Sequence, residues 1–279
     1  MIGISYNSDV FKKIIISVTC VVLLSMIAYF NATRINPGQL QIREETIVSP
    51  KIDEDTDGLL IAFFSDLYYG EFVKEEELQK TIDTILSFQP DVIIFGGDLC
   101  TEDCEREYLL SCLSSLKASY GKYAVTGELD DERNKTILEE AGFVLLNDKH
   151  NSIDIDRNSY INLIGLSDLN HGQPDPVNAF AGVDTTCYTI VVSHAPDLFN
   201  ELDSYQFDYM LAGHSLGGQI YFPIIDLFFR PEGAKKYFKG KVTVSNKTID
   251  ITNGVGRTKK DARLLSDGEI VLYTLRSAK

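Results

Sequence analysis

Five side chains that could bind a metal ion follow apolar stretches of the chain: Asp66, Asp98, Glu128, His194 and His214. Each stands close behind a run of residues suited to a buried strand. Carboxylates and imidazoles are common ligands of divalent metal ions such as Zn²⁺ and Mn²⁺. Any one of them has an ordinary alternative role, because Asp caps helices and His occupies turns. Five in succession are harder to explain as caps, so the pattern indicates a shared site.

A glycine-rich stretch surrounds His214, from Gly213 to Gly218. The same letters give Gly-x-Ser-x-Gly around Ser215, the pattern of a serine-hydrolase nucleophile elbow. Such hydrolases place the histidine base after the serine, whereas all four histidines of this chain precede Ser215. Pro223 also stands where the helix of the elbow should run. The serine-hydrolase alternative is therefore disfavoured, and the glycines indicate a backbone that closely approaches a site.

The apolar stretches predict strands that alternate with helices in the first half of the chain. Strands are expected at 59–64, 91–95 and 122–126, and helical spacing is seen over 75–88, 106–116 and 132–141. The second half is predicted to contain strands with few helices, at 143–146, 152–155, 160–166, 187–193, 205–212, 242–244, 248–251 and 269–275. This order predicts an α/β fold. Ligands of open α/β sheets bind beyond the carboxyl ends of strands, which is where the five candidate residues stand.

Residues 14–30 form an apolar run without a charge, preceded by Lys12 and Lys13. The length is near the lower limit for a spanning helix, so we expect a single-pass membrane anchor after a short tail, 1–13. A cleaved signal peptide has the same basic start, but no convincing cleavage site follows. A buried core helix is disfavoured because no face is polar. We expect a linker with a possible edge strand at 31–58, and one domain, 59–279, outside the cytoplasm.

The composition limits the partners that the protein can have. The chain has 279 residues, a formal net charge of −15 and a pI of about 4.7. This charge repels the phosphates of nucleic acids, so no nucleic-acid partner is expected. The five cysteines are irregularly spaced and predict no disulfide framework. Cys100 and Cys104 are interpreted as free thiols that would pair only in an oxidising compartment.

The candidate residues and their neighbours resemble the motifs of calcineurin-like metallophosphoesterases, and within them a membrane-associated bacterial branch. The resemblance spans roughly 59–275 and rests on Asp66-Leu67-Tyr68, Gly97-Asp98, Gly127-Glu128-Leu129-Asp130, the lone His194, and Gly213-His214-Ser215-Leu216. The continuation Gly217-Gly218-Gln219-Ile220 resembles the bacterial branch in particular. The resemblance implies a four-layer α/β/β/α sandwich, here preceded by one N-terminal transmembrane helix, and a two-metal site on its loops.

The first of the two family metal sites is depleted in this chain. The family's ligands correspond to Asp66, Tyr68, Asp98 and Leu216. Tyr68 and Leu216 stand where the family has histidine, and Leu216 cannot coordinate a metal. The resemblance therefore implies that the first site is lost and that Asp66 and Tyr68 are its remnant.

The second family metal site keeps four residues able to ligate: Asp98, Glu128, His194 and His214. Glu128 replaces an asparagine and still offers an oxygen. The resemblance thus implies one divalent ion, Mn²⁺, Zn²⁺ or Fe²⁺, since two imidazoles and two carboxylates suit such an ion. The family's histidine that assists at the phosphate is Leu129 here, so the catalytic acid is unknown.

Two hypotheses of function follow from this mixture of kept and lost residues. The first is membrane-anchored hydrolysis of a phosphodiester or phosphomonoester at a one-metal site. The second is a catalytically inactive protein that binds a phosphorylated ligand or a protein partner at the membrane. The missing histidines favour the second, and the joint presence of Asp98, His194 and His214 favours the first.

A lipid-linked small molecule is one expected ligand. The aromatic-rich stretch 221–238, with Lys235, Lys236 and Lys239 nearby, could form a lip that rests on the bilayer. The alternative is that this stretch is an ordinary core segment.

Overall fold

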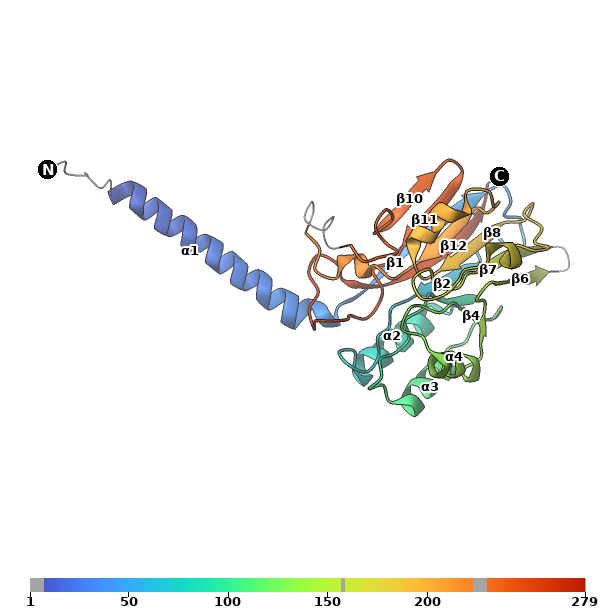
Figure 1. The fold of residues 1–279 in the computed structure, drawn as a ribbon, viewed down its shortest axis with the longest axis horizontal. Helices are drawn as coiled ribbons and strands as arrows, with labels where there is room; N and C mark the ends of the chain where they lie inside the picture. Colours follow the sequence, from blue (N-terminus) through green and yellow to red (C-terminus); the bar gives the residue numbers. More distant parts are fainter. Residues whose placement is uncertain (1–7, 157–158, 223–229, 279) are drawn as a thin grey trace.

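The computed structural model describes residues 8–156, 159–222 and 230–278 and shows two six-stranded sheets (Figure 1). The first sheet has the order β1-β12-β2-β3-β4-β5. Its strands are β1 (Leu40–Ser49), β2 (Leu60–Phe64), β3 (Val92–Phe95), β4 (Lys122–Ala124), β5 (Phe143–Leu145) and β12 (Gly268–Ser277). The second sheet has the order β10-β11-β9-β8-β7-β6. Its strands are β6 (Lys149–Asp156), β7 (Ser159–Gly165), β8 (Thr189–Ser193), β9 (Tyr209–Ala212), β10 (Gly240–Val244) and β11 (Lys247–Ile251).

The strands that precede the candidate residues run parallel to one another within each sheet. In the first sheet β2, β3 and β4 pair in parallel, because α2 (Glu75–Phe88) and α3 (Arg106–Ser115) supply the crossovers. In the second sheet β8 and β9 pair in parallel. Parallel neighbours end at the same edge of a sheet, so the loops after these strands are brought together.

The crossover helices form where the sequence supplies both a start and an apolar face. In α2, Glu75, Glu76 and Glu77 occupy the first turn, where carboxylates stabilise the helix dipole. Leu78, Ile82 and Ile85 recur at helical spacing and are buried against the first sheet. The helix ends at Gln89, which adopts a left-handed conformation just before Pro90.

Three apolar clusters hold the layers together. One lies between the first sheet and helices α2, α3 and α4 (Glu132–Glu140). A second joins the two sheets through residues such as Phe63 and Leu211. A third covers the other face of the second sheet with α5 (Pro176–Ala179) and the 3-10 segment η3 (Pro196–Leu202). The predicted four-layer sandwich is confirmed, although short helical segments make up its fourth layer.

Helix α1 (Ser8–Phe30) projects away from this sandwich (Figure 1). Within the described part of the chain it is the one helix long and apolar enough to cross a membrane, and none of its apolar window is buried. The core-helix alternative for residues 14–30 is therefore wrong. The short helical segments η1 (Asn31–Ile35) and η2 (Asn36–Gly38) connect α1 to β1, which pairs in parallel with β12 at the edge of the first sheet.

The structure also bears on the cysteines and on the aromatic stretch 221–238. Cys100 and Cys104 are joined in a disulfide, so the free-thiol interpretation is wrong for this pair. Of the aromatic stretch 221–238, residues 223–229 lie outside the described residues. In the described remainder Tyr237 and Phe238 are buried, whereas Phe222 is exposed.

Candidate metal centre

The loops after five parallel or neighbouring strands bring the five candidate residues to one edge of the sandwich. Asp66, Asp98 and Glu128 follow strands of the first sheet, and His194 and His214 follow strands of the second. Asp66, Asp98 and His214 adopt positive φ angles of 55°, 59° and 68°. This backbone region is unfavourable for residues with a side chain and persists only where the surroundings enforce it. The loops are therefore built to hold these side chains in particular directions.

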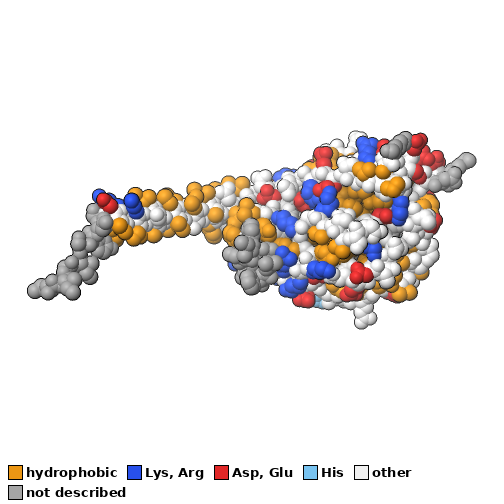
Figure 2. All heavy atoms as spheres, turned by 90° about the horizontal axis from the view of Figure 1, so that it is seen from above, with side chains coloured by type: hydrophobic (Ala, Val, Ile, Leu, Met, Phe, Trp, Pro, Cys, Tyr) orange, Lys and Arg blue, Asp and Glu red, His pale blue; other side chains and the backbone are white. Residues whose placement is uncertain are grey.

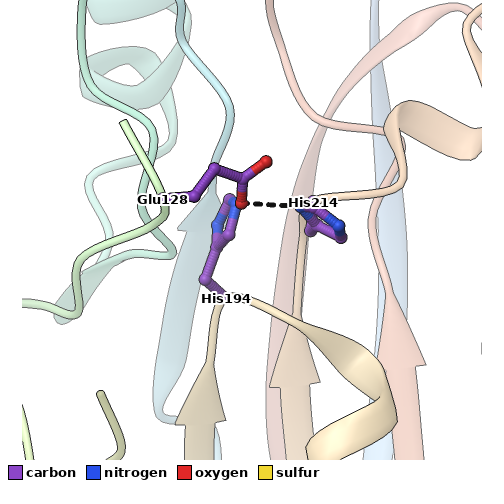
Figure 3. Close-up of side chains that lie close together, drawn as sticks. All are labelled: Glu128, His194 and His214. Carbon is purple, nitrogen blue, oxygen red and sulfur yellow. Dashed lines mark ion pairs between the residues drawn. The ribbon is translucent and has the colours of Figure 1, made fainter. Parts of the chain in front are cut away.

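Glu128, His194 and His214 form the centre of the site (Figure 3). The Oε2 atom of Glu128 lies 2.9 Å from Nδ1 of His214 and 3.2 Å from Nε2 of His194. All three atoms are buried, and none has a hydrogen-bond partner. They can act together as ligands because they point at a common space between the two sheets.

The other nitrogen of each imidazole fixes which ring atom is free. Nδ1 of His194 lies 2.7 Å from the carbonyl oxygen of Gly96, and Nε2 of His214 lies 2.6 Å from that of Glu232. A carbonyl oxygen only accepts, so these nitrogens carry the protons and donate them. The remaining nitrogens then face Glu128 with lone pairs. Histidines held through the second nitrogen in this way are typical of metal ligands.

Asp98 and Asp66 form a second group around His194. One carboxylate oxygen of Asp98, Oδ2, lies 3.4 Å from Nε2 of His194. Oδ2 of Asp66 accepts the backbone N–H of His214 at 2.9 Å, while its Oδ1 is buried without a hydrogen-bond partner. The structure thus brings the four predicted ligands together. Asp98 contacts this group at His194, and Asp66 lies beside Asp98 and His194.

The charges of these buried groups favour a cation. Burial raises the pKa of Asp66, because a carboxylate loses its hydration there. For the two histidines burial alone would lower the pKa. Nearby carboxylates, Asp98 for His194 and Glu128 for His214, outweigh that effect, so both pKa values are raised. Burial acts against ionisation of Glu128, but its close contacts with His194 and His214 prevail and lower its pKa.

The donor set fits a divalent metal ion. Three carboxylates converge with two imidazoles. In the tautomers described above, no proton lies between the ligand atoms of Glu128, His194 and His214. Acceptors at these separations repel each other unless a positive charge lies among them. A proton shared with the imidazoles or a bound metal ion would supply that charge.

Tyr68 and Leu216 stand at the positions where the sequence predicts a depleted first site, and both side chains are buried. Tyr68 is buried, and its hydroxyl donates a hydrogen bond of 2.6 Å to Oδ2 of Asp98. Burial raises the pKa of Tyr68, with Asp98 adding to the effect, so the hydroxyl stays protonated. Leu216 is also buried, whereas Leu129 is 44% exposed on the wall of the cavity beside the site.

A cavity of about 480 Å³ opens over Glu128 and His214. Its walls include the apolar side chains Leu129, Leu216, Ile220 and Pro231, and its rim carries Lys259 and Lys260. The cavity therefore combines ligand atoms on one side with an apolar wall and two cations on another.

His171 and Ser215 differ in their relation to this cavity. His171 is exposed and lies 3.9 Å from the carboxylate of Asp168, and it is absent from the residues that line the cavity. Ser215 lies on the wall, but its Oγ accepts the backbone N–H of Gly217 at 3.1 Å. The free nitrogen of His214 faces Glu128 rather than Ser215, so the serine-hydrolase alternative gains no support.

Asp130 has a role that the sequence alone did not reveal. The next residue, Asp131, caps α4. The buried carboxylate of Asp130 instead accepts the backbone N–H groups of Asp98 and Leu99 at 2.8 Å and that of Gly127 at 2.9 Å. Burial, with a smaller effect of Asp98, raises its pKa to about 6. Asp130 therefore fixes the two loops that carry Asp98 and Glu128.

Arg263 was missed altogether, because an arginine in a polar loop carries no sequence signal. Its guanidinium is fully buried and donates to the backbone carbonyls of Leu216, Asn253, Gly254, Gly256 and Ser266. The Gly254 backbone packs on Asp66, since a Cβ at Gly254 would lie 2.6 Å from the Cβ of Asp66. Arg263 thus supports the loops behind both His214 and Asp66.

Comparison with known proteins places these features in context. No protein-family model matches the chain. It is 30% identical over 205 residues to the phosphodiesterase YaeI of Escherichia coli (strain K12), covering 70% of this chain and 74% of YaeI. It is 28% identical over 257 residues to the uncharacterised metallophosphoesterase YkuE of Bacillus subtilis (strain 168), covering 89% and 90%. It is 26% identical over 261 residues to the UDP-2,3-diacylglucosamine pyrophosphatase LpxG of Chlamydia trachomatis, covering 74% and 78%.

Proposed function

Since this chain belongs to the metallophosphoesterase family, we propose that it is a membrane-anchored phosphoesterase that works with one divalent metal ion. Asp98, Glu128, His194 and His214 would hold the ion, which would be Mn²⁺, Zn²⁺ or Fe²⁺. The observation that carries the proposal is the convergence of three buried, unpartnered ligand atoms from Glu128 and the two histidines. The first family site would stay empty of metal because Tyr68 and Leu216 fill it.

The chain's own groups would divide the work of hydrolysis among them. When bound, the ion supplies Lewis-acid polarisation of the phosphoryl group and lowers the pKa of a water. Glu128 and the histidines would hold the ion, while Asp130 keeps the loops in place. Lys259 and Lys260 would attract the phosphoester to the cavity. Leu129 cannot donate a proton, and loss of a stabilising group of this kind typically costs about 10²–10³ in rate.

The substrate would be a phosphorylated small molecule, and the apolar wall favours one that is linked to a lipid. Leu129 and Ile220 are exposed on that wall, where an acyl or isoprenoid group could cover them. LpxG, a relative, is named for a substrate with two acyl groups, and this chemistry supports the same proposal here. The substrate would be either a phosphomonoester or a phosphodiester.

The anchor would be α1, with a single pass and the domain outside the cytoplasm. Its length and apolar surface support the first point. The disulfide between Cys100 and Cys104 supports the second, because such bonds persist in oxidising compartments. Protease treatment of intact cells tests this orientation. The domain should be digested without lysis, whereas protection until lysis would place it in the cytoplasm.

A second candidate function is binding without catalysis. Tyr68 donates to the carboxylate that should bridge two metals, and Leu129 replaces the proton donor. The fold would then present a phosphorylated ligand or a protein partner with a cavity that does not turn it over. Only the assay of hydrolysis separates the two candidates.

The first experiment is elemental analysis of the full chain, purified in detergent and incubated with Mn²⁺ or Zn²⁺. We expect about one equivalent per chain, lost in the double variant His194→Ala, His214→Ala. The variant His171→Ala is the matched control, because His171 is exposed outside the cavity. Two equivalents would show that the first site survives, and no bound metal would refute the one-metal proposal.

The loaded protein would then be assayed with bis(p-nitrophenyl) phosphate. Hydrolysis that disappears in the double variant would support the enzyme. Metal binding without hydrolysis of this or any monoester substrate would favour the inactive binding protein.

A further inference from the structure

The foot of α1 is attached to the loop that lines the cavity. The backbone N–H of Arg263 donates to the carbonyl oxygen of Ala32 at 2.9 Å. The guanidinium of Arg257 donates to the carbonyl oxygen of Pro37 at 3.1 Å and pairs with Glu77 at 3.0 Å. Residues 258–260, between these two arginines, line the cavity. The end of the proposed membrane helix and the rim of the site therefore belong to one rigid arrangement.

Exposed apolar side chains surround this attachment. They are Ile35, Ile220, Phe222 and Leu265, and Leu265 is 62% exposed. Their segments are linked by backbone hydrogen bonds, since Leu264 donates to Gln219 and Tyr221 donates to Leu264. In water such side chains gain nothing from exposure, whereas the boundary between headgroups and acyl chains would cover them.

Basic side chains belong to the same segments: Arg34 in η1, Lys239, whose Nζ meets the backbone of Leu265, and Lys259 and Lys260 on the cavity. Lys239 donates to the carbonyl oxygen of Leu265 and lies 4.8 Å from the ring of Tyr221. The neighbouring Asp261 is paired with Arg257. Figure 2 shows basic side chains gathered on the part of the domain next to α1. In a chain whose formal net charge is −15, four basic residues thus gather here, with Asp267 as a further acidic neighbour of Lys239.

We propose that this anchor-side surface, formed by the four apolar and four basic residues above, rests in the headgroup region of an anionic bilayer. A basic residue near an anionic surface strengthens the attraction by about fivefold. Salt screens charges that lie more than a Debye length from the bilayer, so the four nearby basic residues outweigh the more distant acidic ones. The cavity then opens at the membrane interface. This inference rests on the proposed anchoring by α1 and is independent of the proposed hydrolysis.

The test uses a spectroscopic property of the chain, which contains no tryptophan. A single tryptophan is introduced as Leu265→Trp in the full chain, and Val177→Trp is the matched control. Val177 is 72% exposed in α5, which packs beside β6, far from α1 (Figure 1). Both proteins are reconstituted in vesicles of phosphatidylcholine and phosphatidylglycerol, some of whose lipids carry bromine near the top of the acyl chains.

We expect the emission of Leu265→Trp to be blue-shifted and quenched by the brominated lipid, and that of Val177→Trp to be unaffected. Phe222→Trp provides a conservative second position and should behave like Leu265→Trp. Equal emission from the two surfaces would overturn the proposal. A blue shift without quenching by bromine would also overturn it, because it would show that protein rather than lipid covers the surface.

The charge component has its own test. Replacing phosphatidylglycerol by phosphatidylcholine, or introducing Lys259→Glu and Lys260→Glu together, should reduce the quenching of Leu265→Trp. Unchanged quenching would refute the role of anionic lipid. Flotation of the vesicles is measured first, and a chain that does not float would overturn the anchoring and this inference together. None of these measurements needs metal or turnover, so an inactive protein would leave the result intact.

Discussion

Replacement of the buried Arg263 by methionine should lower the stability of the protein and weaken its metal site. The guanidinium has no exposed surface, and burial lowers its pKa to about 10 against the opposing effect of Asp66, so it remains charged at neutral pH. Methionine fills much of the same volume with an apolar chain. Arg263→Met therefore removes the hydrogen bonds and the charge while limiting the cavity left behind.

The magnitude follows from the partners that Arg263 leaves behind. It donates at 2.6 Å to Ser266, at 3.0 Å to Asn253 and at 3.2 Å to Gly254, among other carbonyls. A buried acceptor left unsatisfied costs about 1–3 kcal/mol, and the carbonyls that Arg263 contacts lose their donor together. Methionine avoids the cost of burying a cation, which offsets part of this loss. We expect a net loss of about 3–5 kcal/mol in the free energy of unfolding. That corresponds to a thermal midpoint lower by about 10 °C.

The metal site should respond because Arg263 supports the loops behind two candidate groups. Its contacts with Leu216 and Gly254 hold the backbone that follows His214 and the backbone that packs on Asp66. Removal of supporting groups typically weakens metal affinity by about 10–100-fold. We expect a change in that range for Arg263→Met, with partial recovery in Arg263→Lys.

The assay is thermal unfolding of the full chain in detergent, with and without metal, together with a metal titration. Arg106→Met is the matched control, since Arg106 forms surface pairs with Glu107 and Glu140 and should leave the thermal midpoint nearly unchanged. An unchanged midpoint in Arg263→Met would refute the stabilising role. A lower midpoint with unchanged metal affinity would refute the positioning role.

Three further predictions follow from the same structure. Tyr68→Phe removes the hydrogen bond to Asp98, so we expect the metal-free protein to lose about 1.5–3 kcal/mol of unfolding free energy, measured in EDTA, while metal affinity rises because an oxygen is freed. Asp250→Ala leaves the guanidinium of Arg43 without the carboxylate that it meets at 2.9 Å and 3.0 Å, and denaturant unfolding should show a loss of about 3 kcal/mol. For His214, burial lowers the pKa, but Glu128 has the larger opposite effect, so the pKa is raised. The metal-free protein should therefore be most stable below about pH 6.5 and lose stability as the pH rises through the raised pKa. The thermal midpoint against pH in EDTA measures this slope, which should be smaller in His214→Ala and would contradict the reasoning if it ran upward.

The elements of the fold were predictable because each is specified by nearby residues. The apolar runs 59–64 and 91–95 correspond to β2 and β3, and helical spacing over 75–88 corresponds to α2. Glycines and acidic residues close behind these runs marked the site loops. Such features depend on periodicity and on local backbone preference, which the sequence states directly.

The pairing of the candidate residues was predictable only in outline. Motif order indicated that Glu128, His194 and His214 belong to one site, and the structure brings their ligand atoms within 3.2 Å of Glu128. The directions of these atoms depend on carbonyl groups far away in the sequence, such as Gly96 for His194. No local pattern encodes a contact between residues that meet only after the two sheets have packed.

The sequence by itself determined the apolar N-terminal helix, the alternation of strands and helices, and the identity of the residues at the edge of the sandwich. The tertiary structure alone decided which imidazole nitrogens are free, that Tyr68 donates to Asp98, that Asp130 and Arg263 hold the loops, and that the foot of α1 meets the rim of the cavity. The physical reason is how far apart in the sequence the interacting residues lie. Secondary structure follows from interactions a few residues apart, whereas a buried polar group finds its partner among whatever backbone the packed sheets bring within hydrogen-bonding distance.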